Sequence, residues 1–179
     1  MEFDKSKKIL VIGRAGMDIY PEPPGTKITN VKDFSTHLGG SAANTCVALS
    51  KLGVSSDLVT CISDDAIGEY ILNKLKEFKV GSRFCRNVDK VFQTQLAVVE
   101  TILKNNQSIL YRNNSCDLQL NKDDIDQINF QDYSAVFISG TALSSEPSRE
   151  AVFYASQKAS MLNIPLIIDL DYRHYNRES

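Results

Sequence analysis

The stretch Leu38-Gly39-Gly40-Ser41-Ala42-Ala43-Asn44 combines residue types that can hold a polar ligand close to the main chain. Gly39 and Gly40 have no side chains, so the backbone there can approach a ligand closely. The small-residue helix that follows offers unpaired N–H groups in its first turn. Asn44, one turn into that helix, can both donate and accept hydrogen bonds. A tight turn before a closely packed helix would explain the same pattern equally well.

Asp18 is a second candidate, in the segment Gly13-Arg14-Ala15-Gly16-Met17-Asp18 that follows a β-branched run. Its carboxylate could accept hydrogen bonds from a ligand hydroxyl. The alternative is a turn-forming aspartate. The glycine spacing is not G-x-G-x-x-G and therefore does not favour a dinucleotide site.

Alternating strands and helices must position these residues. Hydrophobic patterns predict strands over 8–13, 57–62, 135–139 and 165–170, and helices over 41–52, 65–78 and 148–162. Ser63, Asp64 or Asp65 can supply the N-cap of the second helix. Such alternation is typical of α/β proteins with a mostly parallel sheet flanked by helices, whose ligands bind at the carboxyl ends of the strands.

Two segments do not fit the alternation. Residues 94–103 and 107–111 predict a hairpin that turns at Lys104-Asn105-Asn106. Residues 20–34 also lack a helical pattern. We expect these segments to form a small antiparallel layer beside the main sheet.

Composition excludes several classes of function. The chain has 179 residues, of which 42% are hydrophobic, and its 20 basic and 22 acidic residues give a net charge of −2. This charge argues against a general nucleic-acid or anionic-membrane binder. No apolar run approaches the roughly 20 residues that span a bilayer. The cysteines and histidines show no zinc-binding spacing, so we expect no metal site, reduced thiols and a cytoplasmic protein. These residues are Cys46, Cys61, Cys85, Cys116, His37 and His174.

Gly39-Gly40-Ser41-Ala42-Ala43-Asn44, then Leu52-Gly53 and Asp64-Asp65-Ala66-Ile67-Gly68, resemble the N-terminal signature of the ribokinase-like (PfkB) carbohydrate kinases. Within that family, the signature and the stretches 13–20, 111–117 and 169–173 are most similar to the 5-dehydro-2-deoxygluconokinases of inositol catabolism. The sequence departs from the family at Cys46, where Ala is usual, and at Ser63, where Gly is usual. The resemblance implies a ribokinase-like α/β fold with a small antiparallel β lid inserted at about 14–38 and 92–113.

The resemblance also implies roles for individual residues. Asp18 and Asn44 would hold sugar hydroxyls above a floor made by Gly39 and Gly40. Arg112 and Arg173 would face the acid end of a sugar acid, because the planar guanidinium fork suits a carboxylate. Without the family, Arg112 would be a solvated hairpin charge and Arg173 a residue of a frayed end. Two acidic residues at the last strand are second-tier candidates, namely Asp169 and Asp171.

No Gly-x-Gly-Asp occurs in the 179 residues, although the family's catalytic aspartate and anion hole lie in a Gly-Ala-Gly-Asp motif. The resemblance therefore implies a truncated chain, the N-terminal part of a kinase, with no catalytic residue of its own. The complete enzyme would use ATP and Mg²⁺, and we expect this chain alone to bind neither tightly.

Three alternatives remain open at this stage. One is 2-keto-3-deoxygluconate kinase or another PfkB sugar kinase. A second is a noncatalytic sugar-binding or dimerisation module. The third, a nucleotide-binding oxidoreductase domain, is disfavoured by the glycine pattern. A homo-oligomer would form through the lid strands or an exposed sheet edge.

Overall fold

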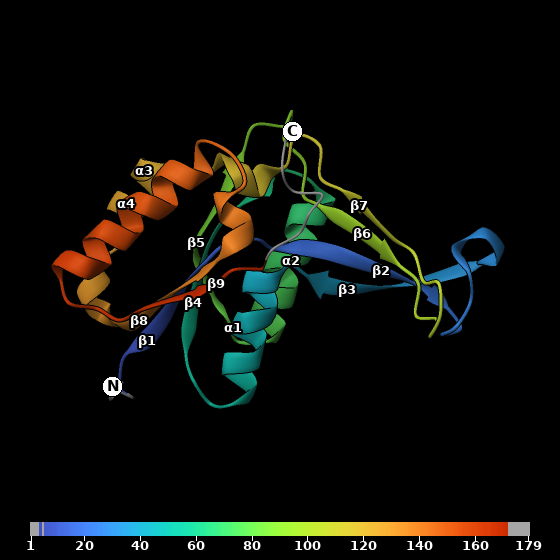
Figure 1. The fold of residues 1–179 in the computed structure, drawn as a ribbon, viewed down its shortest axis with the longest axis horizontal. Helices are drawn as coiled ribbons and strands as arrows, with labels where there is room; N and C mark the ends of the chain where they lie inside the picture. The colour runs from blue at the N-terminus through green and yellow to red at the C-terminus, as the bar shows by residue number, and fades with distance from the viewer. Residues whose placement is uncertain (1–3, 5, 172–179) are drawn as a thin grey trace.

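The computed structural model describes residue 4 and residues 6–171, which form two sheets and their covering helices (Figure 1). The larger sheet has five strands in the order β5-β4-β1-β8-β9, and all its pairings are parallel. These strands are β1 (Lys8–Ile12), β4 (Ser56–Ser63), β5 (Gly81–Val88), β8 (Tyr133–Ser139) and β9 (Leu166–Asp169). The predicted mostly parallel sheet is confirmed.

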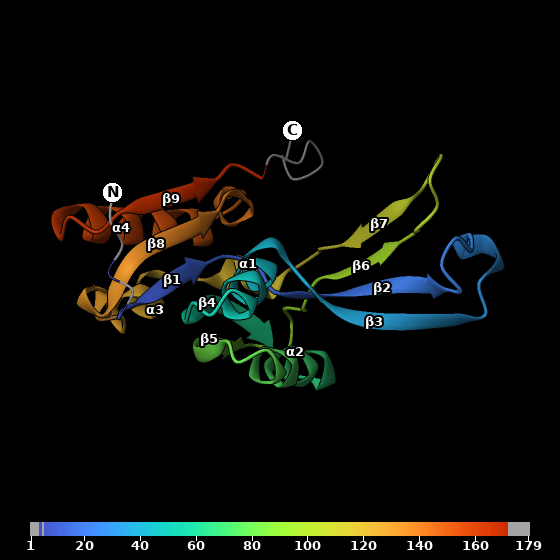
Figure 2. The ribbon, with the colours of Figure 1, turned by 90° about the horizontal axis from the view of Figure 1, so that it is seen from below.

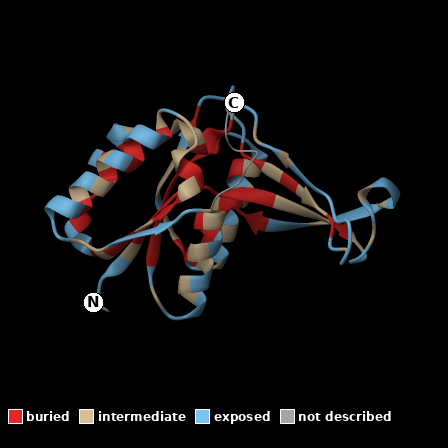
Figure 3. Cartoon of the chain, viewed as in Figure 1, coloured by how far each residue is buried: buried red, intermediate tan, exposed pale blue. Residues whose placement is uncertain are grey.

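Helices cover both faces of this main sheet. Because side chains alternate along a strand, Leu10 and Ile12 of β1 join the core on one face and Val11 joins the core on the other. The two cores appear as the red interior of Figure 3. The covering helices are α1 (Ser41–Lys51) and α2 (Ala66–Glu77) on the Val11 side, and α3 (Lys122–Asp126) and α4 (Ser148–Met161) on the other.

The smaller sheet, here called the lid sheet, extends away from the main sheet as an arm (Figure 2). It contains β2 (Gly16–Glu22), β3 (Asp33–Gly39), β6 (Leu96–Val99) and β7 (Ser108–Tyr111), in the order β3-β2-β6-β7. The β2–β3 and β6–β7 pairs are antiparallel, as predicted, and the two pairs join through parallel pairing of β2 with β6.

Some elements escaped prediction. The edge strand β5 carries Arg83, Arg86 and Asn87 between its apolar residues, which obscures the strand pattern. Helix α3 has only five residues and is defined by the capping box at Asn121 rather than by an apolar face. Within 20–34 only the two ends lie in strands. Short 3₁₀ turns complete the chain: η1 (Ile28–Asn30), η2 (Cys116–Gln119), η3 (Phe130–Asp132) and η4 (Gly140–Leu143).

The two departures from the family signature are accommodated locally. Cys46 lies in α1 and is fully buried in the core that contains Val11. Asp65 is the N-cap of α2, as predicted, and accepts from the N–H groups of Ile67 at 2.9 Å and Gly68 at 3.0 Å. The Ser63 hydroxyl lies 2.7 Å from an Asp65 carboxylate oxygen, to which it donates. Ser63 therefore supports this cap.

The outermost strand, β9, exposes apolar side chains on the described part of the chain. Ile167 is 38% and Ile168 48% exposed, and Leu170 just beyond the strand is 79% exposed. In addition, no strand within residues 6–171 pairs with the outer edge of β9. An exposed apolar edge strand is a template for pairing with another chain.

We therefore predict that the purified chain self-associates through β9. Analytical ultracentrifugation should show oligomers that grow with concentration, and Ile168→Lys should shift them towards monomer because a charge blocks edge pairing. Leu103→Lys, at the exposed tip of the lid sheet, is the matched control. If Leu103→Lys dissolves the oligomers and Ile168→Lys does not, association runs through the lid instead.

Candidate functional site

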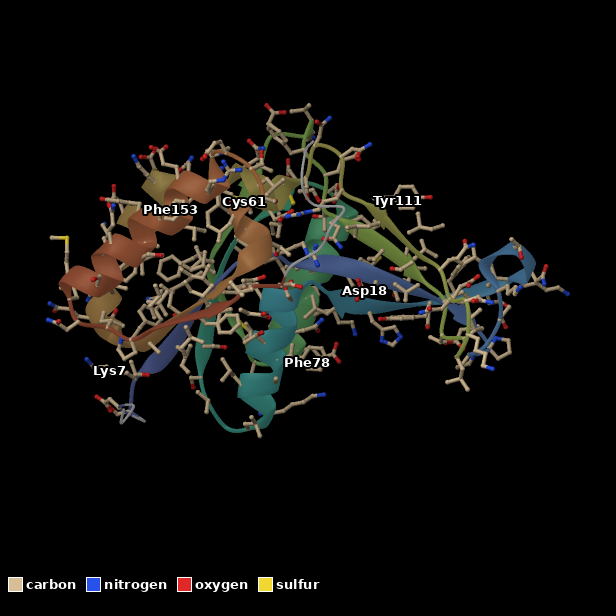
Figure 4. The ribbon with its side chains drawn as sticks, viewed as in Figure 1. Lys7, Asp18, Cys61, Phe78, Tyr111 and Phe153 are labelled. Carbon is tan, nitrogen blue, oxygen red and sulfur yellow. The ribbon has the colours of Figure 1, made fainter. Side chains whose placement is uncertain are left out.

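Asp18 lies in the middle of β2, between His37 of β3 and Ala97 of β6, so it belongs to a strand and not to a turn. Figure 4 labels it where the lid sheet leaves the main body of the protein. A Cβ atom built on Gly39 would overlap the Asp18 carboxylate. The carboxylate therefore lies directly against the backbone of Gly39, and only glycine leaves room for it.

Gly40, the next residue, connects Gly39 to the start of α1. Its φ of 93° is a left-handed value that favours glycine, and a Cβ there would meet the carbonyl oxygen of Arg14 and lie 2.8 Å from the Cα of Ala15. The Ala43 N–H donates to the Arg14 carbonyl at 3.2 Å. Asn44 is exposed in the first turn of α1. The two glycines therefore lie between the Asp18 carboxylate and the start of α1, the helix that carries Asn44.

The Asp18 carboxylate is partly shielded from water. Burial raises the pKa of its carboxyl above the ordinary value, while Arg14, a hydrogen bond with Tyr20 and the charge of His37 act in the opposite direction. A carboxylate held in this way has unused acceptor capacity and a reduced hydration shell. It is suited to accept hydrogen bonds from ligand hydroxyls.

Arg112 follows β7 and is buried rather than solvated, with 9% of its side chain exposed. Its Nη2 donates to Asp117 at 2.7 Å and to the Thr141 carbonyl at 3.2 Å, and its Nη1 lies 3.4 Å from the Ser144 hydroxyl. Asp117 in turn accepts from the Ser115 hydroxyl. The guanidinium is thus fixed in place, and its buried Nε has no hydrogen-bond partner among the described residues.

A hollow of about 740 Å³ opens beside Arg112. Its walls come from β7, η2 and the segment that follows η4, and include Leu110, Leu118 and Ser144. Asp18 and Asn44 do not line it. The candidate residues therefore form two neighbouring groups, one for hydroxyls at the base of the lid sheet and one around Arg112.

Sequence reasoning missed Arg14. This side chain is 9% exposed, and burial followed by the charge of Arg112 lowers the pKa of its guanidinium. The charges of Asp117, Asp171 and Asp18 act in the opposite direction and raise that pKa. A signal was available: Arg14 is the single charge between Ile9 and Met17, directly after a buried strand.

The remaining candidates lie at the end of β9. Asp169 is exposed, and its Oδ1 accepts from the Asp171 N–H at 3.0 Å. Asp171 reaches the neighbourhood of Arg14, as noted above, whereas Arg173 lies outside the described residues. Among residue 4 and residues 6–171, no group of three or more His, Cys, Asp or Glu side chains is arranged to hold a metal ion. No helix in that part of the chain is long and apolar enough to cross a membrane.

Comparison with known proteins agrees with this architecture. Residues 6–173 match the family described as pfkB family carbohydrate kinase. The chain is 32% identical, over 98% of its length, to a 5-dehydro-2-deoxygluconokinase of Photobacterium profundum, and 36% identical over 98% to one of Clostridium perfringens. It covers 53% of each, so it spans about half the length of these curated relatives.

Solved structures show the same fold. An uncharacterized sugar kinase from Pyrococcus horikoshii superposes with a TM-score of 0.80 at 26% identity, over 94% of this chain and 56% of that one. The 2-dehydro-3-deoxygluconokinase of Thermotoga maritima gives 0.84 at 19% identity, over 96% and 53%. The second likeness, at its low identity, concerns the fold alone. The ribokinase-like fold expected from the sequence is confirmed.

Proposed function

Because the chain belongs to the pfkB family of carbohydrate kinases, we propose that it supplies the sugar-binding half of a sugar-acid kinase. The complete enzyme would transfer the γ-phosphoryl group of ATP to a primary hydroxyl of 5-dehydro-2-deoxy-D-gluconate, in inositol catabolism. The names of the curated relatives support this substrate. The observation that carries the proposal is the Asp18 carboxylate seated against the backbone of Gly39, with the charge of the buried Arg14 acting on it.

In this proposal each residue binds the part of the sugar acid that suits its side-chain chemistry. Asp18 accepts from sugar hydroxyls, Asn44 donates and accepts, and Gly39 and Gly40 let the sugar approach the backbone. Arg112 faces the acid end, and Arg173, outside the described residues, joins it. Asp169 and Asp171 contribute from the last strand. The segments 14–38 and 92–113 act as the lid over the sugar.

Phosphoryl transfer also needs a nucleotide site and a catalytic base, in addition to the residues that bind the sugar. ATP and Mg²⁺ would supply the phosphoryl group and its charge neutralisation when bound. The described residues provide no metal cluster, and the 179-residue sequence has no Gly-x-Gly-Asp. We propose that the base and the nucleotide site belong to the part of the relatives that this chain does not span. Its four cysteines are free thiols, which supports a cytoplasmic location.

We predict that the 179-residue chain alone shows no sugar-dependent ATP turnover. A positioned general base contributes roughly 10²–10⁴-fold and one oxyanion donor roughly 10²–10³-fold to a rate, so their joint absence removes measurable catalysis. ADP release with 5-dehydro-2-deoxy-D-gluconate is the measurement, and the full-length Clostridium perfringens relative is the control. Sugar-dependent ADP release by the 179-residue chain would contradict the prediction.

Sugar binding should nevertheless be measurable. In a thermal-shift panel, 5-dehydro-2-deoxy-D-gluconate should raise the melting temperature more than D-ribose or D-fructose, because only the acid offers a carboxylate to arginine. A stronger shift with 2-keto-3-deoxygluconate would favour that kinase activity instead. Stabilisation by ribose but by neither acid would reject the proposed function.

The exposed strand β9 supports a second candidate, a noncatalytic module that dimerises through this edge. A stable dimer without affinity for any sugar acid would favour it over the kinase half.

A further inference from the structure

Arg14 is a buried cation that no other described residue pairs with. It is 9% exposed, and its Nε has no hydrogen-bond partner within residue 4 and residues 6–171. Each of the other four described arginines forms an ion pair. Those pairs are Arg83–Asp57, Arg86–Asp124, Arg112–Asp117 and Arg149–Glu146. Arg14 is therefore the exception that needs an explanation.

Leaving a guanidinium in this state is unfavourable. Burial removes water from a charged group, and the penalty is recovered only when an opposite charge and hydrogen bonds replace that water. The neighbouring Arg112 adds repulsion, and the charges of Asp117, Asp171 and Asp18 offset these two effects only in part, because the pKa of Arg14 stays lowered. A ligand that brings a negative charge to Arg14 would offset both the burial penalty and the repulsion from Arg112. The ligand-free chain therefore has a position that favours binding of an anion.

The surroundings select the kind of anion. Arg112 also has a buried Nε without a partner, so two arginines offer unused donors in one neighbourhood. Asp18, which is suited to sugar hydroxyls, is near enough for its charge to act on Arg14. An anion that carries hydroxyls a short distance from its charge could use both residues. A planar carboxylate on a polyhydroxylated chain matches this arrangement.

The backbone of Arg14 is held by the glycine floor itself. Its carbonyl accepts from the Ala43 N–H and packs against Gly40. The elements that bring the sugar hydroxyls to Asp18 thus also fix the position from which the Arg14 side chain starts. Such rigidity is what a specificity-determining residue requires.

We infer that Arg14 binds the carboxylate of the sugar acid together with Arg112, and so determines the preference for acids over neutral sugars. The inference rests on the proposed function, and it names a residue that neither the motif nor the resemblance assigns.

The test is isothermal titration of the full 179-residue chain with 5-dehydro-2-deoxy-D-gluconate and with its neutral primary amide. Arg14→Gln should weaken binding of the acid roughly 10- to 100-fold and leave the amide unchanged. It should not lower the melting temperature of the ligand-free chain, because it removes a buried charge that forms no ion pair with any residue the structure describes. Arg14→Lys, which keeps the charge but loses the planar fork, should recover part of the affinity.

Arg83→Gln is the matched control. It makes the same change of charge at the amino ends of the strands, where Arg83 pairs with Asp57, and should keep the preference for the acid. If the unaltered chain prefers the acid and Arg14→Gln does too, the inference is overturned and the proposed function stands. If the unaltered chain shows no preference, both fail. If Arg14→Gln weakens acid and amide equally and lowers the melting temperature, Arg14 is a structural residue.

Discussion

Replacing Asp117 by asparagine should lower the free energy of unfolding by about 3–5 kcal/mol, because it leaves a buried arginine without its counter-charge. The side chains of Arg112 and Asp117 are 9% and 2% exposed and lie 2.7 Å apart. Asp117 also counteracts the unfavourable charge of Arg14. Its loss therefore leaves Arg112 without its ion-pair partner and removes one of the favourable charges that act on Arg14. Urea unfolding followed by far-UV circular dichroism measures the effect, since the chain has no tryptophan.

Asp132→Asn is the matched control for this variant. Asp132 pairs with Arg83 at 3.9 Å, and both side chains are about half exposed, so the loss should stay below about 1 kcal/mol. The double variant Arg112→Met, Asp117→Leu should be more stable than the two single effects predict, because it removes both charges together. A loss below 1 kcal/mol for Asp117→Asn would show that solvent or another group compensates the charge of Arg112.

The parts of the fold that follow from local pattern could be predicted from the sequence. The run before Gly13 has the β-branched composition of a buried strand, and Asp65 stands where a helix needs a cap. Residues 41–52 and 148–162 carry small and apolar residues at helical spacing. Each of these signals lies within a few neighbouring residues, so no tertiary information was needed.

What could not be predicted depends on contacts between distant parts of the chain. The strand β5 is an edge strand whose arginines pair with Asp57 and Asp124, and those partners lie on other elements. The backbone of Arg14 packs against Gly40, and the charges that act on its buried guanidinium come from residues far away in the sequence, such as Arg112 and Asp171. The motif therefore indicated which ligand groups to expect, but it could not show that Arg14 is the one arginine within residues 6–171 that forms no ion pair there.

Asp18→Asn should weaken sugar binding and strengthen the ligand-free fold at the same time. An asparagine keeps one acceptor but loses the charge, so affinity for 5-dehydro-2-deoxy-D-gluconate should fall roughly 10- to 100-fold at neutral pH. The fold gains because burial is the main cause of the raised pKa of Asp18, which means that the charged form is disfavoured there. The two effects have opposite signs, as expected when a carboxylate is kept for a ligand rather than for stability.

The sign of the pH dependence follows from the same shift. A carboxyl whose pKa is raised on folding contributes stability that is full below its ordinary value of 3.8 and is lost as the pH rises through the raised pKa. The stability advantage of Asp18→Asn should therefore grow as the pH rises through that interval and then level off. Sugar affinity of the unaltered chain should fall as the pH drops through it.

Urea unfolding and titration calorimetry of both proteins between about pH 4 and pH 8 measure these trends. Asp33→Asn, at an exposed position of β3 in the same lid sheet, is the matched control and should change neither quantity. An Asp18→Asn protein that is less stable than the unaltered chain at every pH would mean that the Asp18 carboxylate holds the junction of the two sheets together. In that case the weakened sugar binding would reflect a damaged fold, and the assignment of Asp18 as a hydroxyl acceptor would lose its support.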